Sequence, residues 1–233
     1  MLIYDQVRTM QCMQTAVARG FTRWAAGFVR FDRALALAEK FATLYHANPT
    51  PPIDMRLRRQ GVARTKLFMA PAPQQLGFRW WLLISSGTGP VTVREVLRDA
   101  TERDSRICVA DFELVRIPRA GGAAWTWRIP IDEFETRLAY ASAIAMHVDP
   151  TMAQSYVEHM RTWPGFSAIR TQRSAIWSAM TSARVRAGRV DALRIPTLQP
   201  WPRRLALQGH GTPLAILVER MRQSVAAPTG EQP

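Results

Sequence analysis

The chain has 233 residues, of which 47% are hydrophobic, and it carries a formal net charge of +13 at pH 7. That hydrophobic content can build a folded core, which excludes a wholly disordered chain. The sequence has no apolar run near the roughly 18–20 residues that a membrane-spanning helix needs, so we expect no membrane partner.

The basic residues are almost all arginines, because Lys40 and Lys66 are the only lysines among 31 basic side chains. A planar guanidinium binds phosphate through two parallel hydrogen bonds and stays charged at any relevant pH. Arginine is also abundant in proteins from GC-rich genomes, but that bias alone would not create an excess of positive over negative charge. The excess therefore favours a polyanionic partner, and nucleic acid first.

The charge is unevenly distributed along the chain. The net charge is +7 over residues 1–70, +2 over 71–130, −4 over 131–160 and +8 over 161–233. A uniform compositional drift would not produce this pattern. We expect the basic ends to bind nucleic acid and the acidic segment 131–160 to face a protein partner.

Residues 1–48 predict a helical N-terminal segment, because Val7, Met10, Val17 and Phe21 recur at spacings of three and four. The prolines within residues 46–54 then predict a linker, since proline lacks a backbone donor and disfavours a helical conformation in the residue before it.

Residues 55–130 predict a small α+β unit. The capping-box spacing of Thr92 and Glu95 predicts a short helix over 93–103. Apolar runs and alternating patterns predict strands over 63–70, 78–85, 112–118 and 124–130, the last two joined by a Gly-Gly hairpin. The expected order is β-β-α-β-β in a mostly antiparallel sheet.

Residues 131–225 predict a helical C-terminal domain, and residues 226–233 a disordered tail. The expected helices cover 133–147, the stretch from Asp149-Pro150 to Trp163, 167–187 and 214–224. The whole chain is thus expected to be an α+β protein, with a sheet unit between two helical segments.

The first candidate site lies on the helix over 167–187. Five arginines and no acid occur between Arg161 and Gly188. Helical spacing puts Arg170, Arg173, Trp177 and Arg184 beside an apolar seam, and with Arg186 they are predicted to clamp phosphates and stack bases. The alternative is a solvated basic face with Trp177 turned into the core.

The second candidate site follows the proline-rich linker. Arg56, Arg58, Arg59, Arg64 and Lys66 are predicted to project from a loop or a strand edge, where they can follow a phosphate backbone. The alternative is a flexible basic loop that contacts an acidic neighbour.

Further basic and aromatic residues are candidates for the same surface. A helical reading places Arg19, Arg23 and Arg30 on one face. Trp80 and Trp125 could stack bases from a sheet face, although aromatic residues in strands more often belong to the core.

The sequence offers little catalytic chemistry. Asp111 and Glu113 share one face of a strand, as in metal-dependent nucleases, but no lysine follows at the spacing that such nucleases favour. His147 and His159 could act as general bases in metal-independent RNA cleavage. The histidines and cysteines have no metal-ligand spacing, so we expect no metal and no cofactor.

These observations predict a non-catalytic nucleic-acid-binding protein, with RNA favoured over DNA because interleaved arginine and aromatic residues suit unpaired bases. Two isolated cysteines fit the reducing cytoplasm, and we expect a subunit of a larger nucleoprotein complex.

One alternative is a metal-independent endoribonuclease similar in general character to those that process CRISPR guide RNAs. Another is a winged-helix-like duplex DNA-binding protein built from the helix over 93–103 and the hairpin over 112–130. A third is a protein-interaction module whose acidic partner neutralises the charge.

Overall fold

The structure is a computed structural model that describes residues 1–189, 193–196 and 205–226. The chain is an α+β protein with antiparallel sheets, as expected. It divides into two compact units, Met1–Ile107 with Arg204–Pro233 (unit 1) and Cys108–Arg203 (unit 2). The expected boundaries near 48, 55 and 130 do not coincide with this division. The expected tail over 226–233 lies outside the described residues, except for Ala226.

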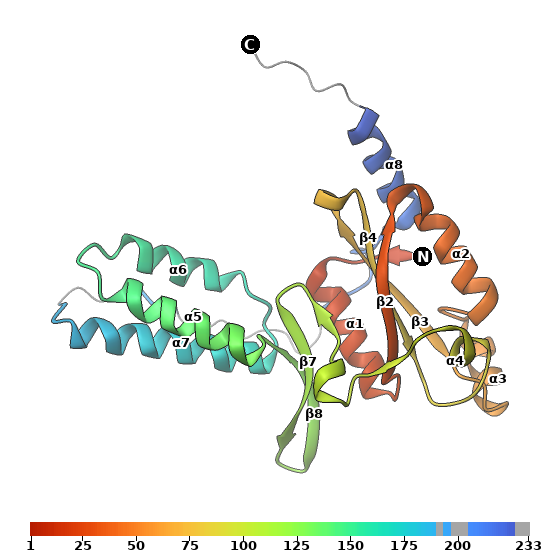
Figure 1. The fold of residues 1–233 in the computed structure, drawn as a ribbon, viewed down its shortest axis with the longest axis horizontal. Helices are drawn as coiled ribbons and strands as arrows, with labels where there is room; N and C mark the ends of the chain where they lie inside the picture. Colours follow the sequence, from red (N-terminus) through yellow and green to blue (C-terminus); the bar gives the residue numbers. More distant parts are fainter. Residues whose placement is uncertain (190–192, 197–204, 227–233) are drawn as a thin grey trace. The chain divides into compact units, whose positions relative to one another are not determined.

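Unit 1 is built on a four-stranded sheet in the order β3-β4-β2-β5 (Figure 1). Its strands are β2 (Arg23–Arg30), β3 (Thr65–Ala72), β4 (Gly77–Ile84) and β5 (Arg98–Asp99). Its helices are α1 (Gln6–Ala18), α2 (Phe31–Tyr45), α3 (Pro51–Arg59), α4 (Pro90–Arg94) and α8 (Leu214–Ala226), with the short 3-10 helices η1 (Pro73–Gln75) and η2 (Arg103–Ser105).

The main core of unit 1 lies between the sheet and the helices α2 and α8. Leu67 of β3 and Leu82 of β4 pack there with Phe41 of α2 and Val218 of α8. The helix α1 contacts β3 and β4, and its buried Met10 lies outside that cluster. Segments far apart in the sequence meet in this unit, because β1 (Leu2–Ile3) pairs with β9 (Thr212–Pro213).

The strand β2 corrects the prediction of a wholly helical N-terminal segment. It pairs with β4 along its whole length, so Gly27 lies opposite Trp80. A Cβ atom at Gly27 would lie 2.8 Å from the Trp80 ring, which shows that the indole lies directly over the glycine. Glycine is needed here because the aromatic ring closely approaches the backbone.

Two other predictions for unit 1 are also wrong. The prolines expected to make residues 46–54 a linker instead open α3, since Pro51 and Pro52 occupy its first positions, where a missing backbone N–H is tolerated. The helix expected over 93–103 does not form: the helix α4 ends at Arg94, and the strand β5 follows it. The winged-helix alternative needed a helix over 93–103, which the structure does not contain.

Unit 2 combines a three-stranded sheet with a layer of three helices (Figure 1). The hairpin and the helices expected over 133–147, after Asp149-Pro150 and over 167–187 are confirmed, with small shifts at their ends. The strands are β6 (Cys108–Val109), β7 (Phe112–Arg119) and β8 (Gly122–Arg128), and the helices are α5 (Ile131–Ala145), α6 (Thr151–Arg161) and α7 (Ser167–Arg186). The expected β-β-α-β-β sheet is thus divided, because β3 and β4 pair with β2 while β7 and β8 pair with each other.

Candidate nucleic-acid interface

The second predicted cluster lies on α3 and β3 of unit 1. Arg56, Arg58 and Arg59 are exposed on α3, so they project from a helix and not from the expected loop. Arg64 directly precedes β3 and Lys66 lies within it, and both are half-buried. The five predicted residues therefore lie on α3 and at the start of the next strand, within one compact unit.

Two of these cations lie over the same aromatic ring. The guanidinium carbon of Arg64 lies 4.8 Å from the centroid of the Phe21 ring, and Nζ of Lys66 lies 5.3 Å from the same centroid. Phe21 is only 2% exposed, so these side chains cover it. Cation–π attraction partly offsets the cost of bringing two like charges together.

Arg19 joins this group at the end of α1. Burial lowers the pKa of Lys66, and the positive charges of Arg19 and Arg64 lower it further. Asp54 and the Cys12 thiol oppose this effect on the pKa of Lys66, and Asp54 pairs with Arg64 at 3.1 Å. We call Arg19, Arg64 and Lys66 the Phe21 cluster. Among the described residues, these three cations have the Asp54 carboxylate as their neighbouring acid side chain, so a bound anion would relieve their mutual repulsion.

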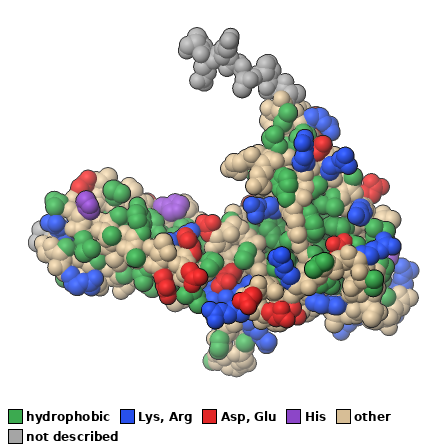
Figure 2. All heavy atoms as spheres, in the orientation of Figure 1, with side chains coloured by type: hydrophobic (Ala, Val, Ile, Leu, Met, Phe, Trp, Pro, Cys, Tyr) green, Lys and Arg blue, Asp and Glu red, His purple; other side chains and the backbone are tan. Residues whose placement is uncertain are grey.

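The arginines of α3 extend this charge around the helix. Successive helical residues are about 100° apart, so Arg58 lies on the same side as Asp54 while Arg56 lies on the side of Gln60. Arg59 lies between Arg58 and Arg56 on the outer surface. Figure 2 shows Lys and Arg side chains gathered over this part of unit 1. A basic surface thus leads from the Phe21 cluster across α3.

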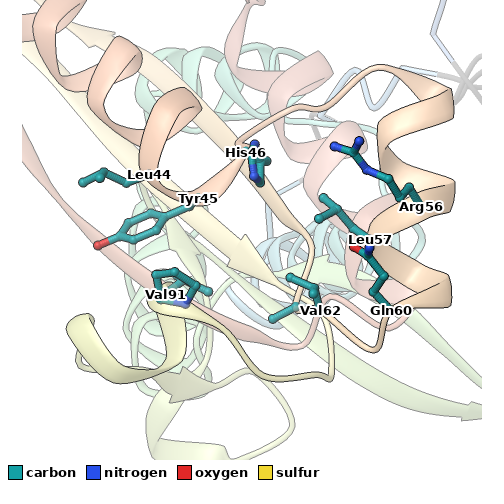
Figure 3. Close-up of a pocket in the computed structure, with 10 residues that line it drawn as sticks. Leu44, Tyr45, His46, Arg56, Leu57, Gln60, Val62 and Val91 are labelled. Atoms are coloured by element: carbon teal, nitrogen blue, oxygen red, sulfur yellow. The ribbon is translucent and has the colours of Figure 1, made fainter.

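A pocket of about 370 Å³ opens on the far side of α3 (Figure 3). His46 and Arg56 lie along its upper side in this view, with the guanidinium extended toward the imidazole, and Leu57, Val62 and Val91 lie below them. Among the residues that the structure describes, neither the His46 side chain nor the Arg56 side chain has a hydrogen bond or an ion pair. The pocket therefore combines an available cation with an apolar floor.

The wall of the pocket is held by a hydrogen bond between α2 and the residue that follows α4. The Tyr45 hydroxyl donates to Oε1 of Glu95 at 2.6 Å. Burial and this bond to a carboxylate raise the pKa of Tyr45 to about 12. His46 ends α2 in a left-handed conformation with φ of 51°, which turns its side chain toward the pocket.

The first predicted site, on α7, is wrong for three of its five residues. Arg173, Trp177 and Arg184 are 5%, 5% and 2% exposed, so they cannot clamp phosphates or stack bases as they stand. Arg173 donates to the carbonyl oxygen of Met160 at 3.1 Å, near the end of α6. Arg184 donates to the carbonyl oxygens of Ala145 and His147 at 3.0 and 3.1 Å, at the end of α5.

These contacts account for Arg173 and Arg184 without a ligand. The last carbonyl groups of a helix have no partner within the helix and carry partial negative charge, so a buried arginine satisfies and stabilises them. Of the five residues, Arg186 is exposed and Arg170 is half-buried. The α7 residues therefore do not form the continuous binding face that the sequence predicted.

The third arginine group is not a helical face. Arg23 and Arg30 belong to β2, and Arg23 donates to the carbonyl oxygens of Ser85 and Gly87 at 2.8 and 3.1 Å. Arg30 lies 3.5 Å from Asp32. Arg19 alone of the three contributes to the Phe21 cluster.

The tryptophans predicted to stack bases are largely structural. Trp80 is half-buried and packs edge-on against Phe41 with ring centroids 5.2 Å apart, at the side of the unit 1 core. Trp125 is half-buried on β8, opposite Arg116.

The residues that the sequence interpretation missed are Phe21, His46 and Gln60. No local signal marks them, because only the packing of α1, α2 and α3 around the sheet places Phe21 beneath the basic residues and brings His46 and Gln60 to the pocket.

The carboxylates considered for nuclease chemistry are each engaged by an arginine. Glu113 lies 2.7 Å from Arg128, and Asp111 lies 3.0 Å from Arg137. Within the described ranges, no group of three or more His, Cys, Asp or Glu side chains is arranged to hold a metal ion. No helix in those ranges has the length and apolar character to cross a membrane.

Comparison with known proteins does not assign a family or a function to the chain. No protein-family model, curated protein or solved structure matches the chain. Function must therefore follow from the chemistry of the site.

Proposed function

We propose that this chain is a non-catalytic nucleic-acid-binding protein that holds a single strand against unit 1. The observation that carries the proposal is the Phe21 cluster, in which Arg64 and Lys66 lie within 4.8 and 5.3 Å of one ring centroid, with Asp54 as the neighbouring acid. A phosphate group would supply the missing negative charge and accept several charge-assisted hydrogen bonds.

The spread of charge across α3 favours a polymer over a small anion. Arg58, Arg59 and Arg56 follow one another around the exposed side of the helix, and Arg56 reaches the pocket. A strand crossing α3 could place successive phosphates on these arginines. Its unpaired base could then enter the apolar pocket, which a base inside a duplex could not do.

This arrangement modifies the expected mode of binding. The arginine–phosphate contacts remain, but Trp177 and Trp80 do not provide stacking surfaces, and the apolar pocket replaces them. RNA remains the favoured ligand because binding is directed to unpaired nucleotides. We also propose a place in a larger cytoplasmic nucleoprotein complex, because the net charge of −4 over residues 131–160 disfavours nucleic acid and suits a protein partner.

The proposal is tested by fluorescence anisotropy with labelled single-stranded RNA, single-stranded DNA and duplex DNA of equal length, across a salt series. We expect the single strands to bind more tightly than the duplex, with affinity falling steeply as salt rises. Equal binding of all three ligands would show that the pocket does not select unpaired bases. Absence of binding at low salt would overturn the proposal and favour an acidic protein partner for the arginines.

One observation favours the second candidate, a metal-independent endoribonuclease. His46 and Arg56 line the same pocket, and an imidazole beside a guanidinium can move a proton next to a stabilised phosphate. RNA incubated with the protein and EDTA would be cut in that case. His46→Asn is the suitable variant because asparagine tolerates the left-handed backbone of this position. It should abolish cleavage and retain binding if His46 is the base.

A further inference from the structure

Unit 2 contains a second pocket with a different chemistry. It encloses about 340 Å³ and is lined by aromatic rings, one carboxylate and one guanidinium. The rings are Tyr140, Tyr156, His159 and Trp163, and the charged residues are Asp111 and Arg137. Apart from His159 and Asp111, none of these residues is a candidate from the sequence.

The four rings form a connected series. Tyr140 and Tyr156 meet edge to face with centroids 5.5 Å apart, Tyr156 lies 6.4 Å from His159, and His159 lies 6.4 Å from Trp163. Tyr140 is 49% exposed although it belongs to this series. An exposed aromatic ring at the mouth of a pocket offers a π face to a ligand.

Arg137 already shows how this site holds a cation. Its guanidinium carbon lies 5.3 Å from the centroid of the Trp163 ring. Its Nε donates to Glu133 at 2.7 Å and its Nη2 donates to Oδ2 of Asp111 at 3.0 Å. The second oxygen of Asp111 has no hydrogen bond among the described residues, and the side chain is 64% exposed.

The charge around the pocket opposes a nucleic acid. Two carboxylates surround one guanidinium, and the segment 131–160 that supplies most of the lining has a net charge of −4 in a chain of +13. A phosphate backbone would be repelled here, whereas a cation would be attracted by the carboxylates and by the electron-rich faces of the tyrosines.

We propose that this pocket binds an arginine side chain of a partner protein. The incoming guanidinium would stack on the exposed ring of Tyr140, beside Tyr156, and pair with the exposed oxygen of Asp111. It would repeat the arrangement that Arg137 makes with Trp163 and the other oxygen of Asp111. Arginine is preferred to lysine because its planar fork both stacks on rings and pairs with a carboxylate. This site lies outside unit 1 and goes beyond the proposed function.

The test uses the full chain and N-acetyl-L-arginine amide as the probe, with N-acetyl-L-citrulline amide as its uncharged counterpart. Binding is followed by the NMR signal of the His159 ring in protein labelled at histidine, assigned with His159→Asn. We expect the arginine probe to shift this signal in a saturable manner and the citrulline probe to leave it unchanged.

Two variants should weaken the interaction. Asp111→Asn removes the pairing charge, and Tyr140→Ala removes a ring that is largely exposed, so both should fold; each should lower affinity about three- to tenfold. Glu135→Gln is the matched control, since it removes an exposed acid of α5 on the side of the helix away from Tyr140. It should change affinity less than about twofold.

The proposal is overturned if the citrulline probe binds as well as the arginine probe, or if Asp111→Asn and Glu135→Gln behave alike. It is also overturned if only adenosine monophosphate or a short RNA moves the His159 signal, because the pocket would then receive a base. These outcomes are independent of strand binding by unit 1, which is measured with a different ligand.

Discussion

Arg184 of α7 donates a hydrogen bond to the carbonyl oxygen of Ala145, the last residue of α5, at 3.0 Å. The same guanidinium nitrogen also lies 3.1 Å from the carbonyl oxygen of His147. Arg173 makes the equivalent contact with Met160 near the end of α6. The helix α7 therefore stabilises the ends of both neighbouring helices through buried arginines.

Arg184→Met should destabilise unit 2 by about 2–4 kcal/mol, because it leaves buried carbonyl groups without a donor while keeping a side chain of similar length. Urea denaturation followed by circular dichroism measures this change. Arg186→Met is the control, since Arg186 is exposed on the same helix, and it should change the free energy of unfolding by less than about 0.5 kcal/mol. Equal effects of the two substitutions would show that Arg184 does not stabilise the end of α5.

Removal of a cation from the Phe21 cluster should reduce the salt dependence of RNA binding. Each phosphate contact with a single strand contributes about 0.7 to the slope of log affinity against log salt, so Lys66→Gln and Arg64→Gln should each lower the slope by about that amount. Arg186→Gln changes the charge equally but lies outside unit 1. A slope that falls by the same amount in all three variants would indicate that the net charge of the protein attracts RNA without localised phosphate contacts at Arg64 and Lys66.

The bond between Tyr45 and Glu95 should make stability depend on alkaline pH. Burial and this bond raise the pKa of Tyr45 from 10.0 to about 12. A raised pKa stabilises the fold below pH 10 and this contribution disappears as the pH rises through 12. Tyr45→Phe should cost about 1–2 kcal/mol near neutral pH, and its deficit relative to the wild type should shrink between these two pH values. Urea denaturation at several pH values tests this, and a constant deficit would contradict it.

The contact between Gly27 and Trp80 should make alanine unacceptable in the middle of β2. Gly27→Ala would force its Cβ atom to within 2.8 Å of the indole and should cost about 1–3 kcal/mol. Ala26→Ser, at the adjacent exposed position, should be nearly neutral. In a background with Trp80→Leu, the alanine should cost much less, as thermal denaturation of the four variants would show. An equal cost in both backgrounds would mean that the indole is not the obstacle.

The sequence predicted most elements that have strong local signals. The hairpin of β7 and β8 was predicted because glycines separate two alternating runs, and α5, α6 and α7 because their ends carry proline or glycine signals. The strand β2 was missed because a strand with Gly27 at its centre and exposed residues beside it lacks a clear alternating pattern. Only its pairing with β4 on one side and β5 on the other makes it a strand.

The candidate site was predicted only in part, for a similar reason. Arg64 and Lys66 were identified from local charge; the structure places both against Phe21 and brings Arg19 close enough to lower the pKa of Lys66. His46 could not be associated with Arg56, because their proximity depends on how the end of α2 packs beside α3. The sequence of α7 could not show that Arg184 meets Ala145, 39 positions earlier in the chain.

The sequence by itself determined the positive charge, the acidic segment 131–160 and the α+β class, because these depend on composition and on patterns within single elements. The tertiary structure decided which arginines face solvent and which are buried as partners of helix ends. Local periodicity cannot make this distinction, since an arginine within a helix has the same spacing whether its guanidinium meets water, a phosphate or the carbonyl groups of another helix. The position of the neighbouring helix end makes the difference, and only the packed fold determines that position.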